Sequence, residues 1–419
     1  MIERGQEFVQ RLRELGQRPS WSWRQCPYCG STRTTKNGSY VRRPRMLQGE
    51  ERRRIQRHWC YACRKSYGER SPDLVYKSWY GREVHRMAVD QWVHLGSSLR
   101  RSAEWIRSLV GHQERWWMWH VWRKPDQEGA PCTLSASTLH RWLRRAGEQA
   151  QEGQPGQWSG VENSGQFGTD GLWARLRDGA KRVVLLVVDT ATGVVWTTKV
   201  SEGEQRAADW SGLFQRLKEA GLPWGDLDGL VSDGAAGLLS FLREFLGRVH
   251  HQRCVWHVWR GLAEEIARLV ATAAEEARDQ LRQEVTRLLH LILDAPTYAA
   301  AEEALQALRA LPGADELAQK VYLLLDRLLY HLLPVHQGLM RVAPEWLWRD
   351  FRLRLSHGRN HGSESRLEQA AAVWMVYHNF TPAQRRSERK RTYKHPGQSP
   401  LQVAGACPGE ISYLDALGV

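Results

Sequence analysis

The sequence of 419 residues has no long apolar run, which argues against a membrane-spanning protein. Its apolar stretches, such as residues 183–188, are far shorter than the roughly 20 residues that span a bilayer. Residues 1–15 have a charged, amphipathic pattern without the apolar core of a secretory signal. We therefore expect an intracellular protein and no membrane partner.

Lysine is scarce, although the chain is strongly basic. Of the 60 basic residues only 10 are lysine, and the formal net charge is +14. Residues 1–150 hold 29 basic and 14 acidic residues, a surplus of 15, so the rest of the chain is close to neutral. The arginine guanidinium matches phosphate and guanine edges. The first third of the chain is therefore expected to bind nucleic acid, the alternative being a solvated basic face.

Cysteine is sparse too, but four of the seven cysteines form two regularly spaced pairs. Cys26 and Cys29 delimit CPYC, and Cys60 and Cys63 delimit CYAC. Two such turns can hold one tetrahedral Zn²⁺ through four thiolates. Disulfides are the alternative, which a reducing compartment disfavours. The pattern predicts a small Cys₄ zinc ribbon in residues 21–76.

The segment between the two cysteine pairs is rich in arginine and predicts a β-hairpin, with turns at "NG" and "GE". Its candidate phosphate-binding residues are Arg42, Arg43, Arg45, Arg52, Arg53, Arg54 and Arg57. The order of CPYCG, a Lys-Asn-Gly turn and a second CxxC followed by an aromatic residue resembles the N-terminal zinc ribbon of many bacterial transposases. An N-terminal helix at residues 1–20 is expected to precede it.

Residues 77–150 are expected to form a helix-turn-helix DNA-binding region. Residues 80–109 have the pattern of two helices joined by a Gly-Ser-Ser turn, and residues 133–149 begin with a Ser/Thr cap and continue with helical spacing. The last helix carries Arg141, Arg144 and Arg145. A Trp-rich segment, residues 111–131, interrupts the region, and a plain helical linker is the alternative interpretation.

The remaining chain predicts a two-part α/β core. A Gly/Gln/Pro-rich linker is expected at residues 151–164. Residues 165–258 then predict the order β-β-β-α-β-α-β, which is that of RNase H-like nucleotidyl transferases. Residues 259–350 are almost wholly helical by period and predict a large all-α insertion. Residues 351–419 are expected to return to the core with a catalytic helix and a C-terminal tail.

Two acidic residues of this core are candidates for chemistry. Asp170 lies inside the first predicted strand, and Asp233 ends the fourth and is followed by small residues. A side chain at the carboxyl end of a strand projects into the crevice where ligands bind. Phosphodiester chemistry uses divalent cations held by converging carboxylates. The competing acids Asp178, Asp189 and Asp228 are interpreted as turn residues.

A third carboxylate is expected on a later helix. Asn360, His361, Ser363 and Glu364 open a helical pattern in which Glu364 and Glu368 lie four residues apart on one face. The stretch HHQRCVWHVWRG, residues 250–261, also offers metal-binding side chains. Ligands so crowded do not easily surround one ion, so a strand leading into a helix is the preferred interpretation.

These features together resemble the Mutator-like superfamily of DDE transposases. The resemblance spans about residues 165–405 and is carried by "TDG", "SDGAAG", a Cys-x-x-His pair, a helical insertion and "RNHGSES". It implies that Asp170, Asp233 and Glu364 form a catalytic triad that binds Mg²⁺ or Mn²⁺. It also identifies Cys254 and His257 as the superfamily's Cys-x-x-His pair, expected to brace the active-site wall by packing and hydrogen bonding.

The function implied is a DNA transposase that binds the ends of its mobile element and catalyses strand cleavage and strand transfer. Its partners would be double-stranded element ends and target DNA, bound by a homodimer or higher oligomer, and its location the cytoplasm at the nucleoid. Zn²⁺ and Mg²⁺ or Mn²⁺ are the expected cofactors. The alternatives are a domesticated, inactive DNA-binding protein and an RNase H-like nuclease without strand transfer.

Overall fold

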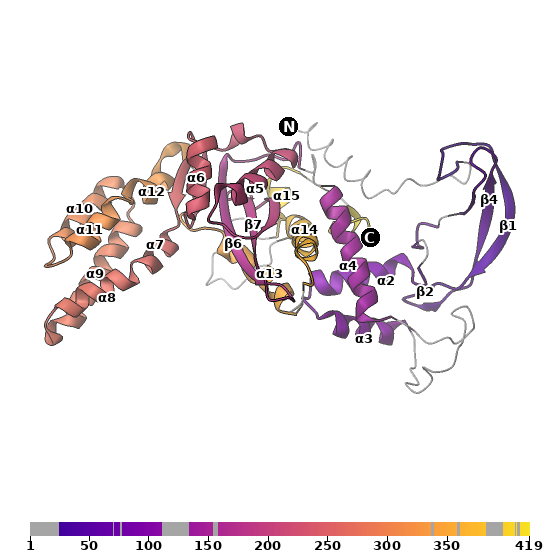
Figure 1. Ribbon diagram of the computed structural model, residues 1–419, viewed down its shortest axis with the longest axis horizontal. Coiled ribbons are helices and arrows are strands. Elements are labelled where there is room, and N and C mark those ends of the chain that lie inside the picture. The colour runs from indigo at the N-terminus through magenta and orange to yellow at the C-terminus, as the bar shows by residue number, and fades with distance from the viewer. Residues whose placement is uncertain are drawn as a thin grey trace.

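The structure is a computed structural model, and it is elongated (Figure 1). It describes residues 25–69, 71–75, 78–110, 134–153, 158–336, 339–357, 361–382, 397–406, 408 and 411–419. The expected N-terminal helix, the Trp-rich segment and Asn360 lie outside the described residues. Within the described part of the chain, no helix combines the length and the apolar character needed to cross a membrane.

The cysteine-rich segment forms a three-stranded antiparallel sheet of order β1-β4-β5 and a separate two-stranded hairpin, β2-β3. The strands are β1 (Thr34–Arg42), β2 (Arg45–Met46), β3 (Gly49–Glu50), β4 (Arg53–Cys60) and β5 (Ser66–Gly68). The hairpin prediction is confirmed, with a turn at residues 47–48 directly before the "GE" pair, but the turn expected at "NG" is wrong. Gly38 has a φ of 69° inside β1, where the pairing with β4 shifts between Lys36 and Ser39. The "NG" pair therefore makes a β-bulge rather than a turn.

Three helices follow, and they confirm the helical pattern of this region. They are α2 (Arg82–Val93), α3 (Leu99–Leu109) and α4 (Ala136–Glu152). The Ser98 side chain caps α3 by accepting a hydrogen bond from the Arg101 N–H, and Ser135 caps α4 in the same way from Thr138. Val84, Ile106 and Leu139, one from each helix, are fully buried in a common cluster.

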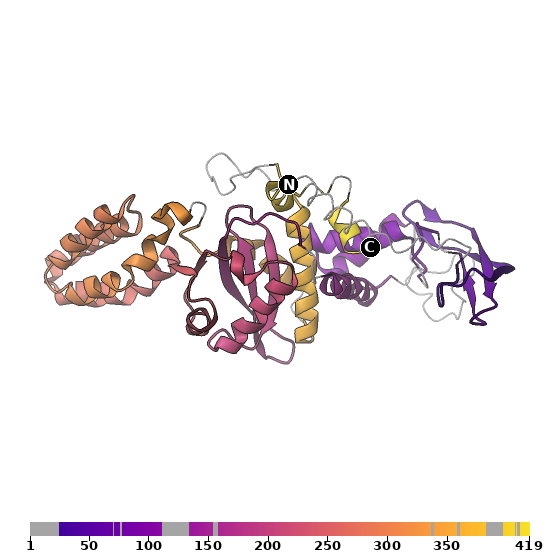
Figure 2. The same cartoon turned by 90° about the horizontal axis from the view of Figure 1, so that it is seen from above.

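These helices also pack directly on the central part of the protein. A Cβ added to Gly147 of α4 would lie 2.5 Å from the Cβ of Gln369 in α14 (Glu364–Phe380), so the two helix backbones approach closely. Arg86 of α2 forms an ion pair of 2.6 Å with Asp415 of α16 (Tyr413–Ala416). Figure 2 shows α14 standing between the central sheet and these helices. The helical region therefore shares a core with the sheet.

The central sheet has five strands in the order β10-β9-β6-β7-β8. They are β6 (Gln166–Arg175), β7 (Lys181–Asp189), β8 (Val195–Ser201), β9 (Gly229–Ser232) and β10 (His250–Arg253). β6, β7 and β8 are antiparallel neighbours, whereas β9 runs parallel to β6 and β10 parallel to β9. Helices α5 (Ala207–Glu219) and α6 (Ala236–Phe245) precede and follow β9, which confirms the expected element order.

The segment expected to be a linker contributes to this core. Helix α4 continues to Glu152, and Trp158 is fully buried with its indole N–H donating to the Trp196 carbonyl at 3.0 Å. Val161 is buried in the same cluster. The Gly/Gln/Pro-rich composition predicted a linker at residues 151–164, but Trp158 and Val161 within this segment are buried.

The predicted helical insertion has a hydrophobic cluster of its own, which includes Val285, Leu289, Leu308 and Leu328. Its helices are α7 (Val255–Gly261), α8 (Ala263–Thr272), α9 (Arg278–Leu293), α10 (Tyr298–Arg309), α11 (Asp315–Tyr322) and α12 (Leu325–Leu329). They extend from one end of the molecule (Figure 1). The chain then returns to the sheet through α13 (Glu345–His357) and α14, followed by α15 (Pro400–Val403) and α16.

Candidate active site and zinc cluster

The four paired cysteines converge, and all of their Sγ atoms lie within 4.8 Å of one another. Cys26 and Cys63 are 3.5 Å apart, and Cys29 and Cys60 are 3.6 Å apart. A tetrahedral zinc with Zn–S bonds of about 2.3 Å separates its sulfurs by about 3.8 Å. The cluster therefore fits Zn²⁺, and all four cysteines are free of disulfides.

The backbone around the cysteines is shaped for metal binding. Each CxxC turn is followed by a residue in the left-handed region, Gly30 with a φ of 69° and Arg64 with a φ of 53°. The Tyr28 N–H points at Cys26 Sγ at 3.4 Å. The backbone N–H of Cys63 is the main cause that lowers the pKa of the Cys60 thiol to about 7. Such backbone donors favour the thiolate, which is the metal-binding form.

The structure divides the arginines of the ribbon into two groups. Arg45 is buried, and Arg42 donates to the Ser78 and Val75 carbonyls, so both stabilise the junction with α2 rather than facing solvent. This corrects the expectation that all seven arginines form one phosphate-binding surface. The exposed members are Arg52, Arg53, Arg54 and Arg57, and Arg53 is paired with Glu51 and Asp73. Arg43 is half-buried and lies 3.9 Å from Glu50.

The three arginines predicted on the last helix of the DNA-binding region are exposed on α4. They are Arg141, Arg144 and Arg145. Arg144 forms an ion pair of 3.3 Å with Glu148, one turn further along the helix. Gly147 of the same helix packs on α14, whereas these arginines face solvent.

Asp170 and Asp233 lie at the same level on neighbouring parallel strands. Gly168 of β6 pairs with Val231 of β9, and each aspartate follows two residues later. Asp170 is 6% exposed, and its pKa is raised to about 8. Burial is the main cause, and the charges of Asp233 and Glu345 add to it, although the Gly171 N–H opposes the shift. The buried Asp170 and the half-buried Asp233 are therefore close enough for their charges to interact.

The loop that carries Asp233 is fixed by several contacts. The Ala235 N–H donates to Asp233 Oδ1 at 3.0 Å. Gly234 has a φ of 78°, and an added Cβ would overlap the Arg253 guanidinium, so only glycine suits this position. Ser232 Oγ accepts from the Gly234 N–H at 2.9 Å and lies 2.7 Å from His251 Nε2. The polar chain from His251 to Gly234 holds the aspartate at the strand end.

Two further carboxylates approach the aspartates, and the sequence had not singled out either. Glu345 is the first residue of α13, and its charge contributes to the raised pKa of Asp170. The pKa of Glu204 is also raised, chiefly by burial and then by Asp233, and its carboxylate accepts from Trp173 Nε1 at 3.3 Å. The positions of these residues depend on tertiary packing, so nothing in the local sequence marks them.

Glu364 lies away from Asp170, at the other end of β6. It opens α14 behind the Ser363 cap, and its Oε2 accepts from Arg182 Nε at 2.7 Å. Arg182 pairs with Ala174, which is four residues or about 13 Å beyond Asp170 along β6. Among the described residues, the cysteine cluster is the only group of three or more His, Cys, Asp or Glu residues with all ligand atoms within 4.8 Å.

The other acids considered from the sequence have structural partners. Asp189 is fully buried and accepts from the N–H groups of Ala191 and Thr192, so it caps the β7–β8 turn as expected. Asp178 accepts from the Ala180 N–H in the β6–β7 turn. Glu368 forms an ion pair of 2.9 Å with Arg216 on α5.

The histidine-rich stretch distributes its side chains among different neighbours. His250 stacks on Tyr330 and lies 2.6 Å from His336, whereas His251 contacts Ser232. Cys254 is buried, and its N–H donates to the Ser232 carbonyl at 2.8 Å. His257 Nε2 lies 3.0 Å from Glu345 Oε1. Cys254 and His257 thus line the wall beside Asp233 and Glu345.

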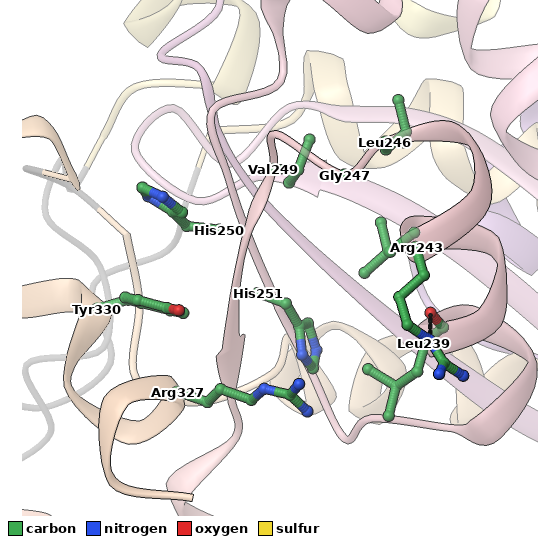
Figure 3. A pocket seen from close by; sticks show the side chains of 10 residues that line it. Leu239, Arg243, Leu246, Gly247, Val249, His250, His251, Arg327 and Tyr330 are labelled. Carbon is green, nitrogen blue, oxygen red and sulfur yellow. Dashed lines mark hydrogen bonds between the residues drawn. The ribbon is translucent and has the colours of Figure 1, made fainter.

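A separate cavity of about 390 Å³ lies between α6, β10 and α12 (Figure 3). Its lining residues include Leu239, Leu242, Arg243, Leu246, Val249, His250, His251, Arg327 and Tyr330. Burial is the main cause that lowers the pKa of His251 to about 3, and the nearby charges of Arg253 and Arg327 lower it further. His251 lines this cavity, and its Nε2 lies 2.7 Å from Ser232 Oγ, next to Asp233.

The comparisons with known proteins agree with this α/β core. Residues 167–336 match the family model described as Transposase, Mutator family. No curated protein matches the chain. The matched residues include Asp170, Asp233, the Cys254–His257 pair and the helical insertion, but not α13 or α14.

The match suggests a class of protein, the nucleotidyl-transferase-type enzymes. More particularly, residues 167–336 are similar to the transposase domain of the Mutator family, and this similarity supports a DNA transposase.

Proposed function

We propose that this protein is a DDE transposase with an RNase H-like core, which binds the ends of its mobile element and catalyses metal-dependent strand cleavage and strand transfer. The observation that carries the proposal is the pair Asp170 and Asp233. Each follows a paired residue of two neighbouring parallel strands by two positions, the two charges interact, and both residues lie in the stretch that matches the Mutator family. The order of the five strands, with β6 central and β7 antiparallel to it, agrees with the proposed fold.

The donor set at this pair suits Mg²⁺ or Mn²⁺. Both ions prefer carboxylate oxygens, and neither favours the thiolates found in the ribbon. The raised pKa of Asp170 reflects a buried carboxylate next to other acidic groups, an arrangement that a bound cation would stabilise. When bound, the cation would polarise the phosphodiester and activate the attacking oxygen.

Three acidic residues are the proposed cation ligands. Asp170 and Asp233 would hold the cation, and the proposed third ligand from the family resemblance is Glu364. Because Glu364 is paired with Arg182 here, its use at the aspartates requires that ion pair to open. Water would first cut one strand at the element end, and the freed 3′-OH would then attack target DNA in line at the same site.

Recognition of the element ends is proposed to lie in the N-terminal region. The zinc-ribbon fit of the cysteine cluster and the exposed arginines on β4 and α4 support this assignment. Arginine–phosphate contacts release counterions from DNA, so such binding would depend steeply on salt concentration. A homodimer or higher oligomer would bring two ends together, in the cytoplasm at the nucleoid.

The DNA that flanks the gene provides the substrate for the test. A labelled duplex that carries the flanking inverted repeat is incubated with full-length protein, Mg²⁺ and a supercoiled target plasmid. The proposal expects cleavage at the repeat and joining of the labelled strand to the plasmid. Cleavage without joining would favour an RNase H-like nuclease, and binding without either reaction would favour an inactive DNA-binding protein.

A further inference from the structure

The first turn of α13 lies directly over the strand that carries Asp170. A Cβ added to Gly168 would lie 3.1 Å from Pro344 Cδ, immediately before the helix. One turn later, Trp348 is fully buried and stacks on Trp374 of α14, with ring centroids 5.9 Å apart. Its buried indole N–H is next to Asp170 and is one of the groups that lower the pKa of that carboxyl. The start of α13 is therefore fixed beside the aspartate.

The same turn is tied to the Cys-x-x-His pair. The Val255 N–H donates to the Arg341 carbonyl at 2.9 Å, and His257 Nε2 lies 3.0 Å from Glu345 Oε1. Cys254 connects this segment to the aspartates, because its N–H donates to the carbonyl of Ser232, the residue before Asp233. One continuous set of contacts thus joins the end of β9, the start of α7 and the start of α13.

This arrangement places three acidic groups in one neighbourhood with a histidine behind the third. The Glu345 side chain is 33% exposed and has room to turn towards solvent. The contact with His257 opposes that movement. Glu364, by contrast, is held by Arg182 at the far end of β6.

We propose that Glu345 is a carboxylate ligand of the cation site at Asp170 and Asp233, and that His257 is the positioning residue that holds it there. This inference rests on the proposed function and deepens it. It gives the Cys-x-x-His pair a physical role: Cys254 anchors the segment to the strand end, and His257 aims Glu345. A ligand whose outer partner is removed loses orientation, which in metal sites weakens affinity by about 10- to 100-fold.

The test measures Mn²⁺ binding to the full-length protein by titration calorimetry and by electron paramagnetic resonance, without DNA. Glu345→Gln keeps the shape and removes the charge, and it should weaken Mn²⁺ binding about 100-fold. His257→Gln should weaken it about tenfold. The exposed Glu264→Gln on α8 is the matched control and should bind as the unaltered protein does. A thermal melt of each variant identifies any that fails to fold.

A double-substitution cycle separates positioning from a general structural effect. If His257 acts through Glu345, adding His257→Gln to Glu345→Gln should cause no further loss of Mn²⁺ affinity. Additive losses would overturn the positioning role. If His257→Gln does not fold, Glu345→Gln alone decides whether Glu345 is a ligand.

Two further variants separate the failure of this inference from the failure of the proposed function. Unchanged Mn²⁺ affinity in Glu345→Gln, together with its loss in Asp170→Asn, would overturn the inference and leave the proposed function standing. Loss in Glu364→Gln but not in Glu345→Gln would likewise assign the site to Glu364. Full Mn²⁺ affinity in Asp170→Asn would contradict the proposed function itself.

Discussion

Replacing Asp170 with asparagine should stabilise the cation-free protein while removing its activity. Asp170 is 6% exposed, and its pKa of about 8 lies well above the ordinary value of 3.8. Between these two values the unfolded chain has released the proton and the folded chain still holds it. Each rise of one pH unit in this window therefore lowers the free energy of unfolding by about 1.4 kcal/mol.

The size of the effect follows from that slope. From pH 5 to pH 7 the unaltered protein should lose about 2.7 kcal/mol that Asp170→Asn does not lose. Denaturant unfolding at both pH values, with a chelator present and the Trp fluorescence recorded, gives the change in the free energy of unfolding for each protein. Addition of Mg²⁺ should reduce the difference in the free energy of unfolding between the two proteins at pH 7, because a cation stabilises the ionised carboxylate. An equal pH dependence in the two proteins would refute the claim that Asp170 is buried among acidic neighbours.

Three other outcomes follow from the structure. Purified protein should contain one zinc per chain, and the double substitution Cys60→Ser, Cys63→Ser should release it. Full zinc in that variant by elemental analysis would contradict zinc binding by the four cysteines. Arg52→Ala and Arg54→Ala should each weaken DNA binding across sequences and lower the slope of log affinity against log salt concentration by about one. Fluorescence anisotropy at several salt concentrations measures this slope. An unchanged slope would exclude phosphate contacts at these residues. Because its pKa of about 3 lies below that of a free histidine, His251 stabilises the fold above pH 6.5, and this contribution is lost as the pH falls. His251→Gln should therefore lose about 2.7 kcal/mol less than the unaltered protein between pH 6.5 and pH 4.5, and parallel losses in denaturant unfolding would contradict this.

The sequence predicted the elements of the core well, because its periodic patterns are strong. The apolar run of β7 is buried along almost its whole length, and β6, β8, β9 and β10 follow with the expected helices between them. The helix starts at Ser98 and Ser135 were readable because a side-chain cap is a local signal. The two cysteine pairs were equally clear, since their spacing alone defines a metal turn.

The predictions from the sequence were weaker where a position depends on distant contacts. Trp158 is buried and its indole N–H donates to the Trp196 carbonyl, a contact that the local composition does not reveal. Arg45 has the same residue type as its exposed neighbours, and only the packing of β2 against the segment at Tyr80 buries it. Glu345 reaches Asp170 through the return of the chain after the insertion, so its proximity could not be derived from spacing.

The central claim is that Asp170 and Asp233 form the site of phosphodiester chemistry. The most direct test compares Asp233→Asn with Asp178→Asn, an exposed acid in the β6–β7 turn, in strand transfer of a labelled element end with Mg²⁺. End binding is measured in the same samples. Asp233→Asn should bind the end normally but join no DNA, while Asp178→Asn should retain joining. Strand transfer by Asp233→Asn at the rate of the unaltered protein would contradict this claim.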